Sequence, residues 1–363
     1  MKSLACVALV LSLAACGPNQ PVAQTMPGPN PPQTTPAPEP PKISAGGVQL
    51  SGPYTHANLS VFLVHKPGVA KDVANYLTLE EAFAAKTLQV TEKGEGGQVN
   101  TLEVENTGDQ PVYLQAGDTV KGGKQDRTIG IDFLLQPKSG KQSVDAFCVE
   151  PGRWQGRAGA SAGGARYANV FGAAQAPVAT KEQKLAVKLD RDQSKVWEEG
   201  RKVNKDLAEK SASGRGAGTP SPQLDSYVLT AEAPNVLAKT SEYTEALLKI
   251  VDVKEDVVGM AFAVNGEPST IEIYGGPALF KKLWPKLLKG ASMEALSKKT
   301  DQAPARQASA EDIKILMTQA SDGKTSTRDL AQDVKLETID AAKTAIFETR
   351  VKGEFLHRQV LSK

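Results

Sequence analysis

The sequence predicts an α+β fold, with a largely antiparallel β-sheet or sandwich and several packed helices. Between residues 87 and 150, short apolar segments alternate with turn signals, and the connections are too short for parallel crossovers. Helical patterns dominate the middle of the chain, and a pair of strands returns near residue 363. The sequence has no repeat with the period of a solenoid or a propeller.

The first half of the chain is rich in predicted strands. The segment 59–65 (LSVFLVH) alternates well enough for a strand. Thr78 and Glu81 have the spacing of a capping box, so we expect a short helix that runs through Lys86. Turn signals separate five further expected strands, at 87–92, 99–106, 111–116, 129–135 and 143–150.

The second half combines helices with fewer strands. Two glycine-containing segments, 152–176 and 211–222, are expected to be loops. Pro277 suits the first turn of a helix that Pro285 should end or kink, and Ser309 should cap another helix. The other expected elements are helices at 190–210 and near 242–251, strands at 257–264 and 269–274, and a hairpin of 344–350 with 354–360.

Residues 1–15 have the pattern of a secretory signal peptide. Lys2 supplies a positive start, residues 4–13 are apolar, and small residues precede Cys16. The apolar run is too short to span a membrane. The pattern resembles the lipobox of bacterial lipoproteins, which implies cleavage before Cys16 and attachment of fatty acyl chains, such as palmitate, to that residue. Gly17 in place of Asp favours an anchor in the outer membrane, facing the periplasm.

The mature chain is expected to consist of a tether and one folded domain. Residues 16–45 are rich in proline, which favours an extended polyproline II spacer after the lipidated cysteine. We expect a single α+β domain over residues 46–363. The formal net charge of +2 lacks the basic excess typical of nucleic-acid-binding proteins, so nucleic acid is not an expected partner.

Two polar, glycine-punctuated patches bracket the predicted strand at 129–135. Together they concentrate charges, hydrogen-bond donors and a lone thiol, which predicts a site. The first patch contains Asp118, Lys121, Gly122, Gly123, Lys124, Gln125, Asp126 and Arg127, and the second contains Cys148, Glu150, Arg153 and Trp154.

These residue types suit an anionic or polyhydroxylated small ligand. Arg127 and Arg153 offer planar forks for carboxylate or phosphate, and Gly122-Gly123 can present successive backbone amides. Acidic residues in the patches supply acid–base capacity or salt-bridge partners. The same residues are also consistent with a purely structural network, in which the arginines pair with Asp126 and Glu150.

Cys148 allows two interpretations. Cys6 leaves with the signal and Cys16 is expected to be lipidated, so Cys148 has no intrachain disulfide partner. A nucleophilic thiolate would need exposure and a positive neighbour such as Arg127, with Glu150 or Asp126 as acid–base. The apolar flanking residues suit a buried, inert thiol instead.

Three familiar motifs are not supported. The G-x-S-x-G match at 159–163 lies in a Gly/Ala-rich tract. A nucleophile elbow needs a strand directly before it, and the preceding residues are polar and do not predict one. The segment 117–125 lacks the Ser or Thr that holds magnesium in a phosphate loop. His56, His65 and His357 are too dispersed for paired metal-ligand spacing, so neither a metal nor another cofactor is expected.

The runs AGDTVKGGKQDRT and FCVEPGRW resemble a domain family that is named for its association with ADP-ribosylglycohydrolases and rhodanese-phosphatases. The segment GGPALFKKLWPKLLKGASMEAL resembles the C-terminal portion of the same family. The resemblance covers roughly residues 50–361. The family's activity is not established, so the resemblance implies that the two patches form one signature and implies no reaction.

Three functions follow as hypotheses. The first is a lipid-anchored envelope protein that binds a small ligand at the 117–154 cluster. The second is a hydrolase or transferase with Cys148 as nucleophile, and the third is an envelope structural or interaction protein whose cluster is a polar network only. The ligand and any protein partners are not specified by the sequence.

Overall fold

The computed structural model describes residues 47–68, 75–156, 169–174, 178–212, 225–252, 255–302, 304, 306–319, 322–330 and 333–363, and the backbone of 43–45. These residues belong to one compact unit that covers residues 39–363. The predicted signal peptide and acylation site, the G-x-S-x-G match and most of the two predicted loops lie outside the described residues.

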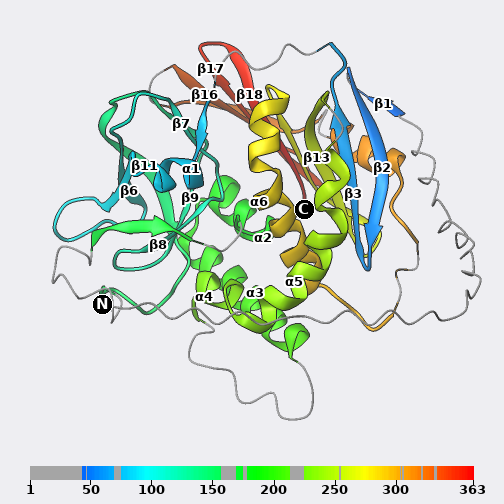
Figure 1. Cartoon of the computed structure of the whole chain (residues 1–363), viewed down its shortest axis with the longest axis horizontal. Helices are drawn as coiled ribbons and strands as arrows, with labels where there is room; N and C mark the ends of the chain where they lie inside the picture. Colours follow the sequence, from blue (N-terminus) through cyan, green and yellow to red (C-terminus); the bar gives the residue numbers. More distant parts are fainter. Residues whose placement is uncertain are drawn as a thin grey trace, which may run out of the picture. The chain divides into compact units, whose positions relative to one another are not determined.

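A large antiparallel sheet forms the centre of this unit, and in Figure 1 its strands run from blue (β1–β3) to red (β17 and β18). Among the described residues nine strands belong to it, with neighbours always antiparallel. In spatial order they are β1 (Ile43–Ala45), β2 (Val48–His56), β3 (Leu59–His65), β13 (Val257–Val264), β14 (Glu267–Tyr274), β18 (Glu354–Ser362), β17 (Thr344–Val351), β16 (Val334–Asp340) and β15 (Lys324–Asp329).

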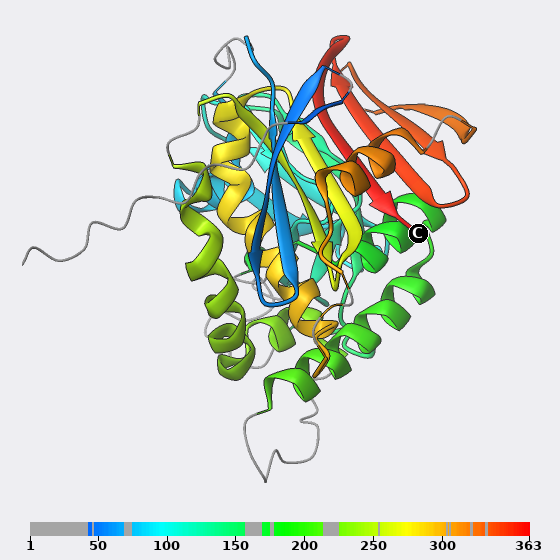
Figure 2. The same cartoon turned by 90° about the vertical axis from the view of Figure 1, so that its right-hand side faces the viewer.

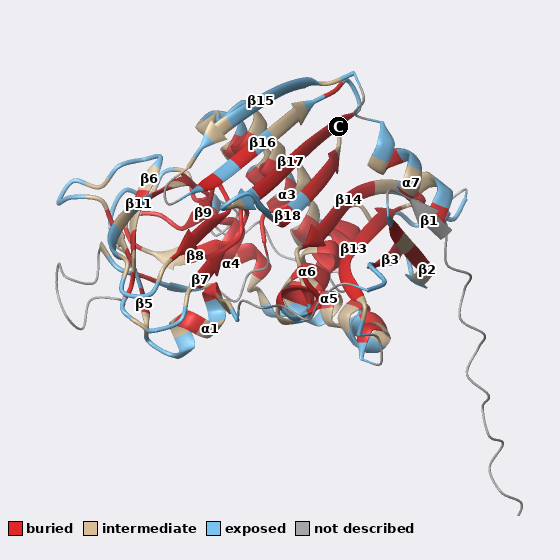
Figure 3. Ribbon diagram, turned by 90° about the horizontal axis from the view of Figure 1, so that it is seen from above, coloured by how far each residue is buried: buried red, intermediate tan, exposed pale blue. Residues whose placement is uncertain are grey.

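The two faces of the large sheet carry different helices because side chains alternate along a strand. Leu63 and Met260 pack in the same core as the long helix α6 (Pro277–Ser297). Phe62 and Ala261, one residue away along each strand, pack in the core that contains α7 (Ala310–Thr318). Figure 2 shows both helices, in gold and orange, against the sheet. β15 is an exposed, polar edge (Figure 3), a composition that discourages edge-to-edge pairing.

Two smaller sheets pack on the strands at the β16–β18 side. Leu336, Phe347 and Leu361 of the large sheet share a core with the apolar side chains of the smaller sheets. One small sheet has the order β10 (Phe133–Leu135), β7 (Val112–Leu114) and β4 (Leu77–Thr78). The other has the order β12 (Phe171–Ala173), β8 (Thr119–Gly122), β9 (Arg127–Ile129), β11 (Gly140–Cys148), β6 (Thr101–Asn106) and β5 (Leu88–Glu92).

The remaining helices lie between residues 79 and 251. Several of them share a core with the end of β11 and with Met293 and Leu296 of α6. The elements are α1 (Leu79–Ala84), α2 (Lys181–Leu185), a π-helix η2 (Ala186–Asp190), α3 (Gln193–Ser211), α4 (Tyr227–Ala231), α5 (Pro234–Leu247) and a 3₁₀ turn η4 (Leu248–Val251).

The α+β class and several local predictions are confirmed. Thr78 and Glu81 form the capping box, with Thr78 N donating to Glu81 Oε2 at 2.9 Å and Glu81 N to Thr78 Oγ1 at 3.3 Å. Ser309 caps α7 in the same way, with Asp312 as the reciprocal partner. The predicted strand pair β13–β14 and the hairpin β17–β18 are both present.

Other predictions need correction. The expected strand 129–135 is two strands, β9 and β10, because Asp132 leaves the sheet and accepts a hydrogen bond from Ala116 N. Pro285 does not end α6, which continues to Ser297 with buried residues on both sides of the proline. The expected loop 152–176 contains β12, which pairs with β8. The helix expected near 242–251 begins earlier, at Pro234. Strands β1, β2, β4, β8, β15 and β16 were not predicted.

Candidate functional site

The structure brings the two predicted polar patches together. β8 and β9 form a hairpin, and β9 pairs with the end of β11 so that Arg127 lies opposite Cys148. The residues between β8 and β9 and those after β11 therefore meet at one end of the second small sheet. We call the resulting cluster the Arg127 network; it contains Glu92, Asp126, Arg127, Cys148, Glu150 and Arg153.

Arg127 is fully buried, and both of its Nη atoms form hydrogen bonds inside the protein. Its Nη2 lies 3.0 Å from Oε2 and 3.3 Å from Oε1 of Glu92, a residue on β5 that the sequence did not indicate. Its Nη1 donates to the Val99 carbonyl and to Cys148 Sγ. Because a buried charge needs compensation, the Glu92 carboxylate is the group that keeps this arginine inside the fold.

Arg153 holds the second half of the network. Its Nη2 lies 2.7 Å from Glu150 Oε2 and 3.6 Å from Asp126 Oδ1. Its two Nη atoms also donate to the carbonyls of Gly122 and Gly123, at 3.2 and 2.9 Å. Glu150 Oε2 in turn accepts from Asp126 N at 3.2 Å, so donors and acceptors of the two patches satisfy each other.

The amides of Gly122 and Gly123 are used within the protein. Gly122 N donates to Asp126 Oδ1 at 3.0 Å, and Gly123 N donates to Val170 O at 3.1 Å. Both glycines have positive φ, and a Cβ at Gly123 would lie 2.1 Å from Cζ of Phe171 on β12. Glycine is therefore required here by the close approach of β12, and these amides do not face an open anion site.

Trp154 covers the network from the outside and is 43% exposed. The Arg127 Cζ atom lies 5.4 Å from its ring centroid, and Lys124 Nζ lies 5.6 Å from it. These distances are within the range of cation–π contacts. Lys124 also donates through its ammonium to the Gly96 carbonyl and through its backbone to Glu92 Oε1, so it links the β8–β9 turn to β5.

The Cys148 thiol is buried and protonated. Its residue has 0% exposure, and burial raises the pKa to about 11, with the neighbouring Arg127 opposing the rise. A pKa this far above neutrality leaves little thiolate, which is the form that attacks an electrophile. These observations favour a structural thiol over a nucleophile, and they disfavour the hydrolase or transferase hypothesis built on Cys148.

Three predicted residues, Lys121, Asp118 and Gln125, lie outside the Arg127 network. Lys121 pairs with Glu232, beyond α4. Asp118 lies 2.6 Å from Lys286 Nζ of α6 and accepts a hydrogen bond from Gln115 N. Burial raises the pKa of Asp118 to about 6, against the attraction of Lys286. Gln125 is buried, and its Oε1 bonds no described residue.

A second ionic cluster lies where β14 and β18 meet the small sheets. His357 is fully buried on β18; its Nδ1 lies 2.8 Å from Asp132 Oδ2 and its Nε2 lies 2.7 Å from Glu272 Oε2. Lys184 of α2 lies 3.0 Å from Glu272 Oε1. We call this cluster the His357 centre; it contains Asp132, Lys184, Lys188, Glu272, His357 and Gln359.

Opposite charges stabilise one another in the His357 centre. Burial alone would lower the pKa of His357, but Asp132 and Glu272 raise it above the ordinary 6.5. Burial alone would raise the pKa of Glu272, but Lys184 and His357 lower it to about 2. An imidazole with a carboxylate at each nitrogen is an imidazolium, since only that form donates from both atoms.

Sequence reasoning missed this centre because its members are far apart along the chain. His357 and Asp132 are separated by 225 positions. The one available signal was Asp132 itself, a carboxylate inside the apolar run IGIDFLL, because a buried charge implies a buried partner.

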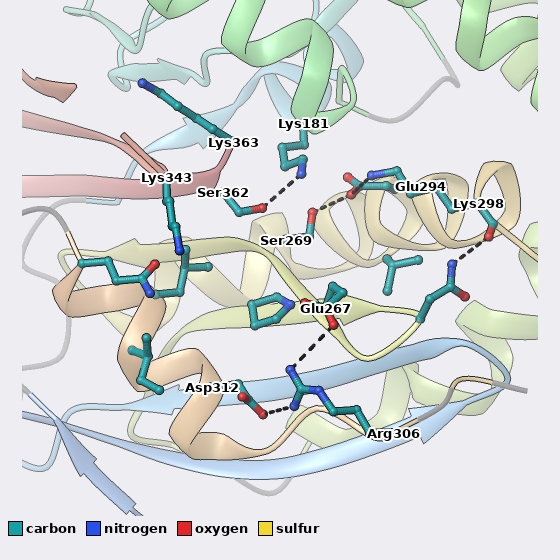
Figure 4. Close-up of a pocket in the computed structure, with 16 residues that line it drawn as sticks. Lys181, Glu267, Ser269, Glu294, Lys298, Arg306, Asp312, Lys343, Ser362 and Lys363 are labelled. Atoms are coloured by element: carbon teal, nitrogen blue, oxygen red, sulfur yellow. Dashed lines mark hydrogen bonds and ion pairs between the residues drawn. The ribbon is translucent and has the colours of Figure 1, made fainter. Parts of the chain in front are cut away.

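A large cavity lies along the β13–β14 turn, α6, α7 and the ends of β17 and β18. It has a volume of about 700 Å³, and Figure 4 shows the side chains around it. We call it the cleft; it is lined by Lys181, Val264, Asn265, Glu267, Pro268, Ser269, Glu294, Lys298, Arg306, Asp312, Ile315, Leu316, Gln319, Lys343, Ser362 and Lys363.

Basic side chains outnumber acidic ones in the cleft. Lys298 is neutralised by Glu294 and Glu182, at 2.9 and 2.8 Å, and Arg306 by Asp312 at 2.8 Å. The Lys343 ammonium, by contrast, forms no hydrogen bond or ion pair with any residue that the structure describes. An exposed ammonium without a protein partner can take up an anionic ligand without first breaking a contact.

The cleft approaches the His357 centre through a cavity of about 20 Å³, which is large enough for one water molecule. Lys181 and Glu294 line both cavities. The smaller one is also lined by Lys184 and Glu272, which belong to the His357 centre. A ligand in the cleft would thus be one layer of side chains from the buried charges.

The described residues contain no group of three or more His, Cys, Asp or Glu side chains able to hold a metal ion. Within the same part of the chain, no helix is long and apolar enough to cross a membrane.

Fold and geometry together define an α+β domain that carries a buried ionic centre beside an open, cationic cleft. Residues 47–361 match the model of the ARG and Rhodanese-Phosphatase-superfamily-associated Protein domain. The chain belongs to this family, as the motifs around Arg127 and Arg153 predicted. The comparisons with curated proteins and with solved structures found no match.

Proposed function

We propose that this protein binds a small anionic ligand in the cleft and is held in a bacterial envelope by a lipid on Cys16. The observation that carries the binding proposal is the Lys343 ammonium, which lines a cavity of about 700 Å³ without a partner among the described residues. That volume lies within the range of small-molecule sites in proteins.

A second ammonium in the cleft is only weakly neutralised. Lys181 Nζ donates to the neutral Ser362 Oγ at 3.0 Å and lies 3.7 Å from Glu182 Oε1. In Figure 4 its side chain comes from the opposite side of the cavity to α7. A phosphate, sulfate or carboxylate group between Lys343 and Lys181 would gain charge-assisted hydrogen bonds that the two ammoniums do not make within the fold.

The Arg127 network is not the proposed ligand site. Its guanidinium groups already bind Glu92, Glu150 and backbone carbonyls, and displacing them would leave buried carboxylates without partners. We infer that the network has a purely structural role, in which it holds β5, β9 and β11 together. The burial of Cys148 gives no support to catalysis by that residue.

Thermal unfolding of the protein in the presence of a ligand panel tests the binding proposal. The panel should pair each anion with a neutral analogue: a sugar phosphate with the free sugar, and a nucleotide with its nucleoside. A ligand that binds only the folded state raises the melting temperature, and the shift grows with the ligand concentration relative to its Kd. The proposal predicts shifts with anionic members only; equal shifts with neutral analogues, or none at millimolar concentration, would contradict it.

The anchor rests on the sequence of residues 1–16, and labelling tests it. In a Gram-negative host fed a labelled palmitate, the protein should carry label and sediment with membranes. Cys16→Ser should remove the label and release the protein, whereas Cys148→Ser should leave both unchanged. Label retained by Cys16→Ser would refute the anchor.

A further inference from the structure

A second cationic cavity reaches the His357 centre through Lys188, which belongs to both. It has a volume of about 290 Å³ and shares no lining residue with the cleft. Its wall is formed by the end of η2 and by one face of the hairpin β15–β16. The lining residues are Lys188, Leu189, Arg191, Lys324, Ser326, Arg328, Leu336, Thr338 and Asp340.

The charges of this cavity are unbalanced. Four of its lining residues are basic and only Asp340 is acidic, and Asp340 already pairs with Lys363. Arg191 and Arg328 share one carboxylate oxygen, Asp145 Oδ2, at 3.0 and 3.2 Å. Lys324 is exposed, and its ammonium forms no hydrogen bond or ion pair with any of the described residues. Two arginines on one carboxylate repel each other, so an added anion between them is favoured.

Lys188 is the buried member of the cavity, with 9% of its surface exposed. Its Nζ donates to Gln359 Oε1 at 3.0 Å and lies 4.3 Å from the Phe347 ring centroid. An ammonium has three donors, and Gln359 is its one hydrogen-bond acceptor in the described structure. Burial lowers the pKa of Lys188 to about 8, and Asp132 and Glu272 oppose the decrease. The group therefore lacks a direct anionic partner.

The local backbone explains how these groups converge. The chain forms the π-helix η2 over Ala186–Asp190 and then places Arg191 in the left-handed region, with φ of 53°. The wider turn of a π-helix changes the direction of its side chains relative to an α-helix, and such segments are frequent at functional sites. Here the turn places Lys188 and Arg191 in the same cavity wall as Lys324 and Arg328, which lie on one face of β15.

We propose that this cavity binds a small multivalent oxyanion of the phosphate class. Arg191 and Arg328 offer planar forks to its oxygens, Lys324 closes the outer side, and Lys188 contributes from the buried side. A multivalent anion suits the net charge of the lining better than a single carboxylate does. Gln359 bonds both Lys188 and Glu272, at 3.0 and 2.7 Å, so the bound anion lies at the end of a chain that reaches His357.

Titration calorimetry of the folded protein with pyrophosphate, and separately with inorganic phosphate, tests the proposal. Lys324→Ala removes an exposed ammonium without a partner among the described residues, so the variant should fold, and its affinity should fall about threefold, as for an exposed charge. Arg328→Ala should lower the affinity about tenfold, because an arginine–phosphate contact is lost.

Matched controls separate this cavity from the cleft. Lys335→Ala lies on β16, one residue from Leu336, but its side chain does not line the cavity; this variant should bind like the wild type. In the Lys343→Ala background, which removes the ammonium proposed to bind an anion in the cleft, Lys324→Ala should lower the pyrophosphate affinity by the same factor as in the wild type. The proposal is overturned if Lys324→Ala and Lys335→Ala bind pyrophosphate equally well, or if the wild type shows no binding at millimolar concentration.

Discussion

His357 and Glu272 are 85 positions apart in the sequence, yet the His357 Nε2 atom lies 2.7 Å from Glu272 Oε2 in the core. Asp132 binds the other imidazole nitrogen at 2.8 Å. This one side chain thus joins β18, β14 and the segment between β9 and β10. Charged side chains are almost never fully buried unless they are paired, and here each charge has a partner. Ion pairs as well as apolar packing therefore hold the large sheet against the smaller ones.

Replacing His357 by alanine should strongly destabilise the fold. The substitution leaves Asp132 and Glu272 buried without the cation between them, and breaking a buried ion pair from one side costs about 3–5 kcal/mol. The free energy of unfolding in urea measures the loss. His56→Ala, at a partly exposed position, is the matched control and should change little. A loss below about 1 kcal/mol for His357→Ala would show that the centre does not stabilise the fold.

Stability should fall in acid through Glu272. Its pKa is lowered from 4.5 to about 2 in the folded protein, so it contributes stability above pH 4.5 that is lost as the pH falls through 2. The shift corresponds to about 3 kcal/mol. Unfolding free energies of the wild type and of Glu272→Gln, measured between pH 2 and 7, should converge at the acid end. Parallel curves over this range would contradict the assigned charge state.

The Cys148 thiol should resist modification in the folded protein. It is buried and its pKa is raised to about 11, so both access and ionisation are limiting. In a form carrying Cys6→Ser and Cys16→Ser, a thiol reagent at pH 7 should label Cys148 only as fast as the protein unfolds. Urea should accelerate labelling to the rate of a free thiol. Complete labelling of folded protein within minutes would revive the nucleophile hypothesis.

Gly123→Ala should be more destabilising than Gly140→Ala. Both glycines have positive φ, 49° and 62°, so both variants carry a backbone cost of about 1 kcal/mol. A Cβ at Gly123 would also collide with the Phe171 ring, whereas nothing lies within 4 Å of one at Gly140. Overpacking adds about 1–3 kcal/mol. Equal losses in the two variants would mean that β12 does not pack closely on the β8–β9 turn.

Local chemistry explains which features the sequence could predict. The capping boxes at Thr78 and Ser309 and the hairpin β17–β18 depend on residues a few positions apart, so their patterns are visible in the chain. The meeting of Arg127 with Cys148 was also accessible, since both flank one predicted segment. Pro285 does not end α6, because tertiary packing on both sides of it maintains the helix despite the missing donor.

The rest depends on long-range contacts. Glu92 and Arg127, or Lys188 and Gln359, are brought together by sheet topology that no local pattern encodes. The residues that line the cleft lie between positions 181 and 363 of the sequence. The cleft is a candidate ligand site because the Lys343 ammonium has no partner among the described residues. The lack of a partner is visible only in the folded structure. Conversely, the residue types of the patches at 117–154 suit both a ligand site and a structural network, and the folded structure is needed to show that Arg127 pairs with Glu92 and Arg153 with Glu150.

Anion binding in the cleft is decided by the affinity of Lys343→Ala for the strongest anionic ligand from the panel. Lys314→Ala, at a partly exposed lysine of α7 outside the cleft, is the control. We expect a loss of roughly tenfold for Lys343→Ala, as for one charge-assisted hydrogen bond, and none for Lys314→Ala. Unchanged affinity in Lys343→Ala would refute binding at this ammonium.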